Sequence, residues 1–102
     1  MKNTKTVKRK KVKKDKDIEN FLKVVADGNR MKIISVLGRE TLSVTQIHKK
    51  LKIPQNLTSH HISRLKKIDI LKEKKEGTFR FYSVNMTKIR EFVRLLKNKF
   101  GI

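Results

Sequence analysis

Apolar residues in the first part of the chain recur at the three- and four-residue spacing of amphipathic helices. After a polar start, one such stripe consists of Ile18, Phe21, Leu22 and Val25. Asp27 has the short carboxylate of a helix N-cap, and we expect a second helix after it that ends at Gly38. The residues expected to face inward on this second helix are Met31, Ile34 and Leu37.

A second pair of helices is predicted after a short extended link at residues 40–42. Ser43 and Gln46 have the spacing of a capping box, which predicts a helix with Val44, Ile47 and Leu51 on its apolar side. Pro54 marks a tight turn, and the next helix is expected over residues 55–68. Its apolar face is predicted to hold Leu57, His61, Leu65 and Ile68, with Ile62 at the border. Its opposite, polar face is predicted to hold Asn56, Ser59, His60, Ser63 and Lys67.

The rest of the pattern predicts a hairpin and a final helix. Residues 70–75 and 78–84 have strand character and meet at Glu76-Gly77. Asn85 can cap a last helix, whose apolar stripe consists of Ile89, Phe92, Val93, Leu96 and Phe100. A three-helix core followed by a hairpin is a winged helix-turn-helix, mainly α with a small β-hairpin. In this fold the helix after the tight turn enters the DNA major groove, and the hairpin, called the wing, lies along the backbone or minor groove.

The chain is basic along its whole length. It has 102 residues, with 28 Lys and Arg against 9 Asp and Glu, and a formal net charge of +19. This length fits one domain, which we assign to residues 17–102. Residues 1–16 are too polar to bury a core and are expected to form a disordered basic tail. The tail would neutralise DNA phosphates, and the alternative is that it only increases solubility. The residues expected to contact phosphates are Lys8, Arg9, Lys10, Lys11, Lys13 and Lys14.

Composition excludes several other classes. The chain has no cysteine, which excludes disulfides, thiolate metal sites and a cysteine nucleophile. No apolar run is long enough to cross a membrane, and no secretory signal is visible, so we expect a cytoplasmic, nucleoid-associated protein. There is no Gly-rich phosphate loop and no nucleophile–base grouping. We therefore expect no enzymatic activity and no cofactor.

The polar face of the helix at residues 55–68 is the best candidate for reading DNA. Short polar side chains allow close approach to base edges, and asparagine can pair with adenine. The surrounding cations, including those of the wing, would hold phosphates. The alternative is a merely solvated helix face, while the aromatic residues of the hairpin are expected to pack on helices rather than stack on bases. The candidate DNA contacts are Gln55, Asn56, Thr58, Ser59, His60, Ser63, Arg64, Lys66, Lys67, Lys72, Lys74, Lys75 and Arg80.

Four stretches, in the same order and spacing, resemble the arsenic-repressor (ArsR) family of small dimeric winged-helix regulators. Residues 21–30 (FLKVVADGNR) are similar to the family pattern LKALADPTR, and residues 42–47 (LSVTQI) stand where many members have LCVCDL. Residues 55–62 (QNLTSHHI) resemble the recognition-helix pattern QSTVSHHL, and residues 71–77 (LKEKKEG) resemble the wing. The resemblance implies a groove-facing His60 and a partly buried His61.

Departures from the family pattern argue against a metal site. Ser43 and Thr45 occupy the positions of the two metal-binding cysteines, and neither is a soft ligand. The last helix offers only Glu91 among the usual zinc ligands. His60 and His61 are adjacent, so they point about 100° apart and do not readily chelate one ion. We expect no metal.

The first and last helices carry more apolar surface than so small a domain can easily cover. We expect a two-fold interface there, and the resemblance implies the same surface. The alternative is that these helices only close the core of their own protomer. The expected interface residues are Ile18, Phe21, Leu22, Val25, Ile89, Phe92, Val93, Leu96 and Phe100.

The leading functional hypothesis is a homodimeric DNA-binding transcriptional regulator, most simply a repressor that occludes a promoter by binding a palindromic duplex. The high charge keeps a second hypothesis open, an architectural, chromatin-like protein that binds DNA with little sequence preference. An RNA-associated module would use the same charge, although the sequence shows no dedicated RNA-binding motif.

Overall fold

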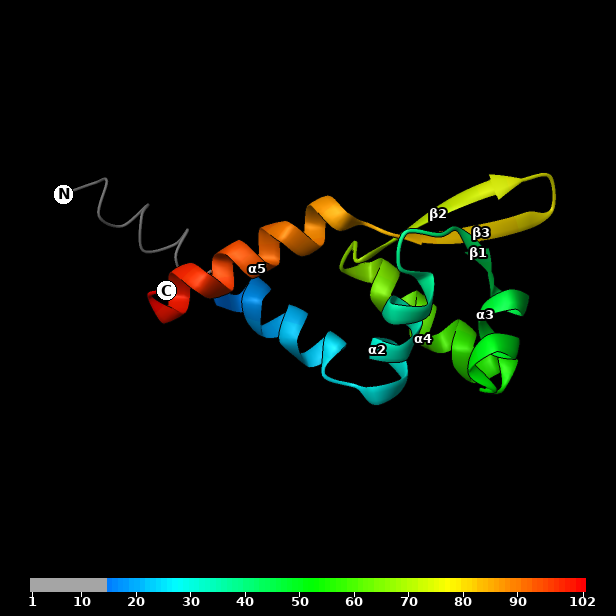
Figure 1. Cartoon of the computed structure of the whole chain (residues 1–102), viewed down its shortest axis with the longest axis horizontal. Coiled ribbons are helices and arrows are strands. Elements are labelled where there is room, and N and C mark those ends of the chain that lie inside the picture. The colour runs from blue at the N-terminus through cyan, green and yellow to red at the C-terminus, as the bar shows by residue number, and fades with distance from the viewer. Residues whose placement is uncertain (1–14) are drawn as a thin grey trace.

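The structure, a computed structural model, describes residues 15–102. The chain is helical over residues 15–25, and the elements that follow are α2 (Gly28–Leu37), β1 (Leu42–Ser43), α3 (Val44–Leu51), α4 (Gln55–Lys67), β2 (Leu71–Glu76), β3 (Phe79–Val84) and α5 (Met86–Phe100). This order confirms the predicted winged helix-turn-helix (Figure 1). Within residues 15–102, no helix is long and apolar enough to span a bilayer.

The first helix includes Asp15 and Lys16, which the sequence pattern assigns to the tail. The basic run between Lys8 and Lys14 lies outside the described residues. Asp15 also contributes a contact, because its carboxylate lies 3.1 Å from the ammonium of Lys99 on α5. Asp15 and Lys16 are therefore part of the first helix, in contrast to the predicted boundary at residue 17.

The ends of the helices follow from local side-chain chemistry. The Asp27 carboxylate accepts a hydrogen bond from the Arg30 backbone N–H at 3.1 Å and caps α2. Ser43 and Gln46 form the predicted capping box of α3, with bonds of 3.2 and 2.9 Å. Gly38 ends α2 at φ 53°, in the left-handed region that favours glycine. These three predictions from sequence are confirmed.

The three strands form one antiparallel sheet in the order β1-β3-β2. The extended link expected at residues 40–42 overlaps strand β1 only at Leu42, which pairs with Tyr82 of β3. Glu73 of β2 lies opposite the same tyrosine on its other side. The hairpin turn is Gly77-Thr78, one residue later than predicted, because β2 continues through Glu76. The wing is thus anchored to the helical core through β1.

The core lies where α2, α3, α4 and the sheet meet, and its fully buried members include Ile33, Leu37, Ile47, Leu65 and Ile70. A second contact joins the first helix to α5, since the rings of Phe21 and Phe92 stack with centroids 4.5 Å apart. The first helix and α5 therefore lie side by side at one end of the molecule, and the wing projects at the other end (Figure 1).

The predicted inner face of α2 is partly wrong. Leu37 is fully buried and Ile34 half-buried, but Met31 is 58% exposed and Ile33 is fully buried instead. Residues spaced by three rotate about 60° per step around a helix. A stripe from Met31 to Leu37 therefore spans too wide an arc to be buried as a whole, and tertiary packing selects the side that holds Ile33.

The predicted inner face of α4 also needs correction. His61, Ile62 and Leu65 are buried as expected, but Leu57 remains partly exposed and Thr58 is fully buried. The buried side of α4 is centred on Leu65, whereas the predicted apolar face is centred between Leu57 and Leu65. A threonine can occupy this arc because its hydroxyl donates to the Pro54 carbonyl at 3.0 Å, which satisfies the buried polar group.

Candidate nucleic-acid interface

The polar face predicted for α4 is exposed as a continuous stripe. Asn56, Ser59, His60, Ser63 and Lys67 are all exposed, as are Gln55 at the start of the helix and Arg64 in its second half. The side chains are short near the N-terminal end of α4 and cationic near its C-terminal end. Such a helix can approach base edges closely at one end and hold phosphates at the other.

Thr58 does not belong to this face. Its side chain is fully buried and hydrogen-bonded to the preceding turn. The sequence pattern counts it among the DNA contacts, and the structure removes it because a residue with no exposed surface cannot touch a duplex.

The wing presents the four predicted cations, Lys72, Lys74, Lys75 and Arg80, and all are exposed. Lys74 is paired with Glu76 at 3.2 Å. Tyr82 is buried as expected for an aromatic residue that packs on the core, but Phe79 is 66% exposed near the tip. The expectation that the wing aromatics pack on helices is therefore wrong for Phe79, because β2 and β3 extend beyond the helices at this point.

A cleft of about 270 Å³ separates α4 from the wing. Ser59, Ser63 and Lys66 line it from α4, and Glu73, Arg80 and Tyr82 line it from the wing. The Glu73 carboxylate accepts hydrogen bonds from the Lys66 ammonium at 2.9 Å and from the Tyr82 hydroxyl at 3.1 Å. The bond from Lys66 is the main cause of a Glu73 pKa below its usual value. Burial, reinforced by the nearby carboxylate, raises the pKa of Tyr82.

The sequence pattern did not reveal Glu73, because the strand from 70 to 75 reads as a source of cations. The available signal was a single acid between lysines, opposite the tyrosine of a predicted hairpin. The structure also changes the expected role of Lys66, whose ammonium is engaged by Glu73.

His61 lies on the buried side of α4, where it contacts α2. Its Nδ1 accepts a hydrogen bond from Arg30 Nε at 3.2 Å, and Arg30 Nη1 donates to the Val24 carbonyl at 2.9 Å. Arg30 therefore connects the inner face of α4 to the C-terminal end of the first helix. Burial lowers the pKa of His61, an effect that the nearby Asp27 opposes and Arg30 reinforces. The position of His61 agrees with the packing role expected for it, and the sequence pattern does not predict its contact with Arg30.

The residues predicted for dimerisation divide into three groups by exposure. Ile18, Phe21 and Phe92 are buried within the protomer, so they contribute to its own core. Val25, Ile89 and Leu96 are half-buried, and Leu22, Val93 and Phe100 are exposed. The first helix and α5 thus retain apolar surface after they have packed on each other.

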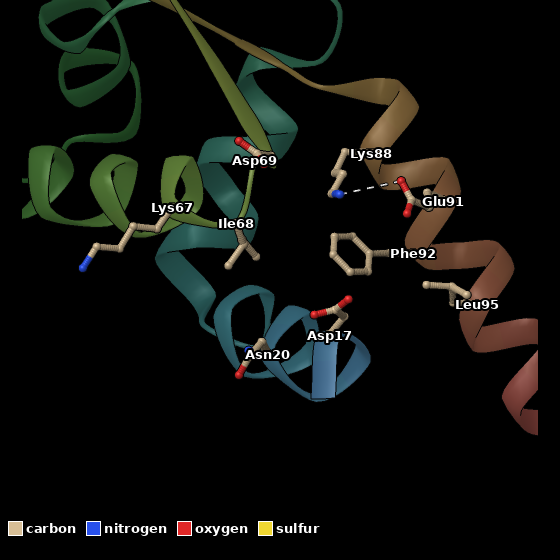
Figure 2. A pocket seen from close by; sticks show the side chains of 9 residues that line it. All are labelled: Asp17, Asn20, Lys67, Ile68, Asp69, Lys88, Glu91, Phe92 and Leu95. Atoms are coloured by element: carbon tan, nitrogen blue, oxygen red, sulfur yellow. Dashed lines mark ion pairs between the residues drawn. The ribbon is translucent and has the colours of Figure 1, made fainter. Parts of the chain in front are cut away.

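A second pocket, of about 230 Å³, lies between the first helix, the end of α4 and α5 (Figure 2). The acidic residues that line it are Asp17, Asp69 and Glu91, and the Glu91 carboxylate pairs with Lys88 at 3.7 Å. Phe92 forms an apolar side of this pocket, and Lys67 points away from it (Figure 2).

Among residues 15–102, no three His, Asp or Glu side chains are placed to hold a metal ion. The Ser43 hydroxyl, at a family cysteine position, caps α3 instead.

The sequence-family model described as a helix-turn-helix domain matches residues 25–74, from the end of the first helix to the middle of β2. A helix-turn-helix-type transcriptional regulator of Methanocaldococcus jannaschii is 36% identical over 85 residues, which cover 82% of this chain and 94% of that protein. The transcriptional repressor PagR of Bacillus anthracis is 35% identical over 81 residues, or 78% of this chain and 81% of the repressor.

Solved structures show the same fold. An ArsR-like transcriptional regulator from Rhodococcus sp. RHA1 superposes with a TM-score of 0.75 at 18% identity and covers 83% of this chain and 79% of its own. Reduced HlyU from Vibrio cholerae superposes with a TM-score of 0.72 at 24% identity, covering 90% and 97% of the two chains. Since the four family stretches lie in the elements that define this fold and the relatives align along most of the chain, the protein belongs to the ArsR family of winged helix-turn-helix, DNA-binding transcriptional regulators.

Proposed function

We propose that the protein is a homodimeric repressor that reads a palindromic duplex with α4 and holds the flanking phosphates with the wing. The observation that carries this proposal is the exposed polar face of α4, with short side chains at its start and cations at its end. Side chains of this kind recognise base edges, whereas a face of lysines alone would hold only phosphates. Repression is proposed because the relatives PagR and SdpR are named as repressors, whereas HlyU of Vibrio cholerae is named as an activator.

The proposed DNA contacts are the predicted set without the buried Thr58 and without Lys66 and Arg80, which lie 2.9 and 3.9 Å from the Glu73 carboxylate. Asn56 and His60 would contact base edges, with Ser59 and Ser63 close to bases or adjacent phosphates. The cations Arg64, Lys67, Lys72, Lys74 and Lys75 would contact phosphates, as would the basic run at residues 8–14. Two copies of α4 about one DNA turn apart would then read the two halves of a palindrome. Binding of this kind would associate the protein with the nucleoid.

The first prediction concerns base reading by α4. We expect Asn56→Ala and His60→Ala each to lower affinity for a duplex selected from genomic fragments by about fivefold or more, because a lost base contact costs about 1–3 kcal/mol. Affinity for a random-sequence duplex should change little. The measurement is fluorescence anisotropy titration of the full chain on both duplexes across a salt series.

Ser35→Ala is the matched control, since Ser35 is an exposed polar residue on α2. It should leave both affinities unchanged. Removal of residues 1–14, which keeps every residue of the helix described at 15–25, should weaken both complexes alike because phosphate contacts carry no sequence information. Equal binding of selected and random duplexes by the intact protein would instead support the architectural alternative.

A further inference from the structure

Glu73 joins the two elements that are proposed to contact DNA. Its Oε1 atom lies 2.9 Å from the Lys66 ammonium of α4, 3.1 Å from the Tyr82 hydroxyl and 3.9 Å from Arg80 Nη1. Glu73 and Tyr82 are direct partners in the β2–β3 register, so their side chains project from the same face of the sheet. One carboxylate therefore links α4 to both strands of the wing.

The burial of the Glu73 side chain distinguishes this network from an ordinary surface ion pair, although its partners Lys66 and Arg80 are 38% and 57% exposed. The Glu73 side chain is only 16% exposed, whereas the exposed fractions of Lys74 and Glu76 in the neighbouring pair are 70% and 58%. Water and salt screen exposed pairs strongly, so these contribute little to geometry. The shielded carboxylate of Glu73, which also accepts a hydrogen bond from Tyr82, holds its partners in a defined arrangement.

The network also changes the charge that the cleft offers to DNA. Lys66 and Arg80 are the two cations in the cleft, and both lie within ion-pair distance of Glu73. A cation that is paired with a carboxylate is less available to a phosphate. Ser59 and Ser63 line the same cleft from α4, so the groups suited to reading bases lie beside cations whose charge is partly neutralised.

We propose that Glu73 is a positioning residue that sets the selectivity of DNA binding, because it fixes the wing against α4 and withholds Lys66 and Arg80 from phosphates in the cleft. This inference rests on the proposed DNA-reading function of α4. In a chain with a net charge of +19, every additional phosphate contact strengthens binding to any sequence. A carboxylate that limits such phosphate contacts increases the relative contribution of base-edge contacts to binding, and with it the preference for one DNA sequence over another.

The test replaces Glu73 by Gln, which removes the charge and retains an oxygen that can accept hydrogen bonds. We expect Glu73→Gln to bind a random-sequence duplex about threefold to tenfold more tightly at low salt. The slope of log affinity against log salt should steepen by about 0.9 for each additional phosphate that the variant neutralises. The preference for a duplex selected by the wild-type protein from genomic fragments should fall by a similar factor, because the affinity for that duplex rises less.

Two further variants separate charge from geometry. Glu76→Gln makes the same charge change on the same strand, but Glu76 pairs with Lys74 and not with α4, so selectivity should be retained. Tyr82→Phe keeps every charge and removes one hydrogen bond to Glu73. It should lower selectivity while the salt slope stays at the wild-type value. Thermal melting of each variant shows that it is folded, and Tyr82→Phe tests the positioning role even if Glu73→Gln does not fold.

The outcomes are distinguishable. If the wild-type protein prefers the selected duplex and Glu73→Gln behaves like Glu76→Gln in slope and selectivity, the role of Glu73 is overturned and the proposed function stands. If Tyr82→Phe retains full selectivity, the positioning role is overturned. If the wild-type protein binds both duplexes alike, the proposed function fails, and the role of Glu73 in selectivity fails with it.

Discussion

The hydrogen bond between Arg30 and His61 requires one particular protonation state of the histidine. Nδ1 of His61 accepts from Arg30 Nε at 3.2 Å, so this nitrogen carries no proton of its own. Protonation would remove the acceptor and place a second positive charge beside the guanidinium. Asp27 is the nearby group that favours the charged form, whereas burial and the cations Arg30 and Arg64, together with His60, oppose it. The neutral form is therefore the one that fits the fold.

The second prediction follows from the direction in which folding shifts the His61 pKa. Burial lowers the His61 pKa from its ordinary value of 6.5, so near and below pH 6.5 the unfolded chain binds more protons than the folded chain. The free energy of unfolding should therefore be constant above this pH and decrease as the pH falls below it, until the folded-state pKa is passed. The measurement is urea unfolding at a series of pH values between about 7.5 and 5.

His61→Gln keeps a side chain that can accept from Arg30 and cannot gain a charge in this range, so its pH dependence should be flatter. His60→Gln is the matched control, since His60 is the exposed neighbour on the same helix, and it should keep the wild-type dependence. Equal slopes for the wild-type protein and His61→Gln would contradict the argument.

The individual elements owe their ends to local capping. The capping box of α3 satisfies two backbone N–H groups, one from Ser43 itself and one from Gln46. This matters because α3 has only eight residues, and a helix of this length is marginal without caps and tertiary packing. The serine that replaces a family cysteine thus acts as a structural residue in this chain.

The third prediction tests that role at the scale of the element. Ser43→Ala removes the side-chain oxygen that accepts the Gln46 N–H, and it should lower the free energy of unfolding by about 1 kcal/mol. Thr45→Ala, at the second family cysteine position and exposed on the same helix, should be neutral or slightly stabilising because alanine is the better helix former. Urea unfolding of both variants checks the difference, and equal stabilities would contradict the capping role.

At the scale of the whole molecule, the unexplained feature is the apolar surface on the first helix and α5. Phe21 and Phe92 are used in the protomer core, but Val93 is 45% exposed, and Leu22 and Phe100 are exposed as well. These three residues lie on the first helix and α5, which pack together at the end of the molecule opposite the tip of the wing (Figure 1). The remaining exposed apolar surface is therefore available for the proposed two-fold interface without disturbing α4.

The fourth prediction concerns this interface. Val93→Glu should weaken self-association by about tenfold or more, because a charge buried in an apolar interface without a partner is costly. Binding to a palindromic duplex should weaken in parallel, while the melting of the protomer changes little. Sedimentation velocity over a range of protein concentrations measures the association.

Met31→Glu is the matched control for this variant. Met31 is an exposed apolar residue on α2, outside the proposed interface, and its replacement should leave association unchanged. A wild-type protein that sediments as a monomer at all concentrations would refute the interface and leave the fold unaffected.

The sequence by itself determined the order of the elements, the three caps at Asp27, Ser43 and Asn85, and the polar face of α4. Each depends on interactions within three or four residues or on a repeating pattern, so the local sequence contains the necessary information. The same patterns located the wing and its exposed cations.

Only the tertiary structure decided which side of each helix is buried and which charges meet. It turned Thr58 inward and Met31 outward, because the packing of several elements selects one arc among those that the pattern allows. Arg30 and His61 are separated by 31 positions in the chain, and Lys66 reaches Glu73 only because β2 folds back beside α4. No periodicity predicts such pairs, since each forms only after independent elements have packed together. The contacts that tune the proposed DNA reading are therefore properties of the fold, whereas the elements that carry it can be predicted from the local sequence.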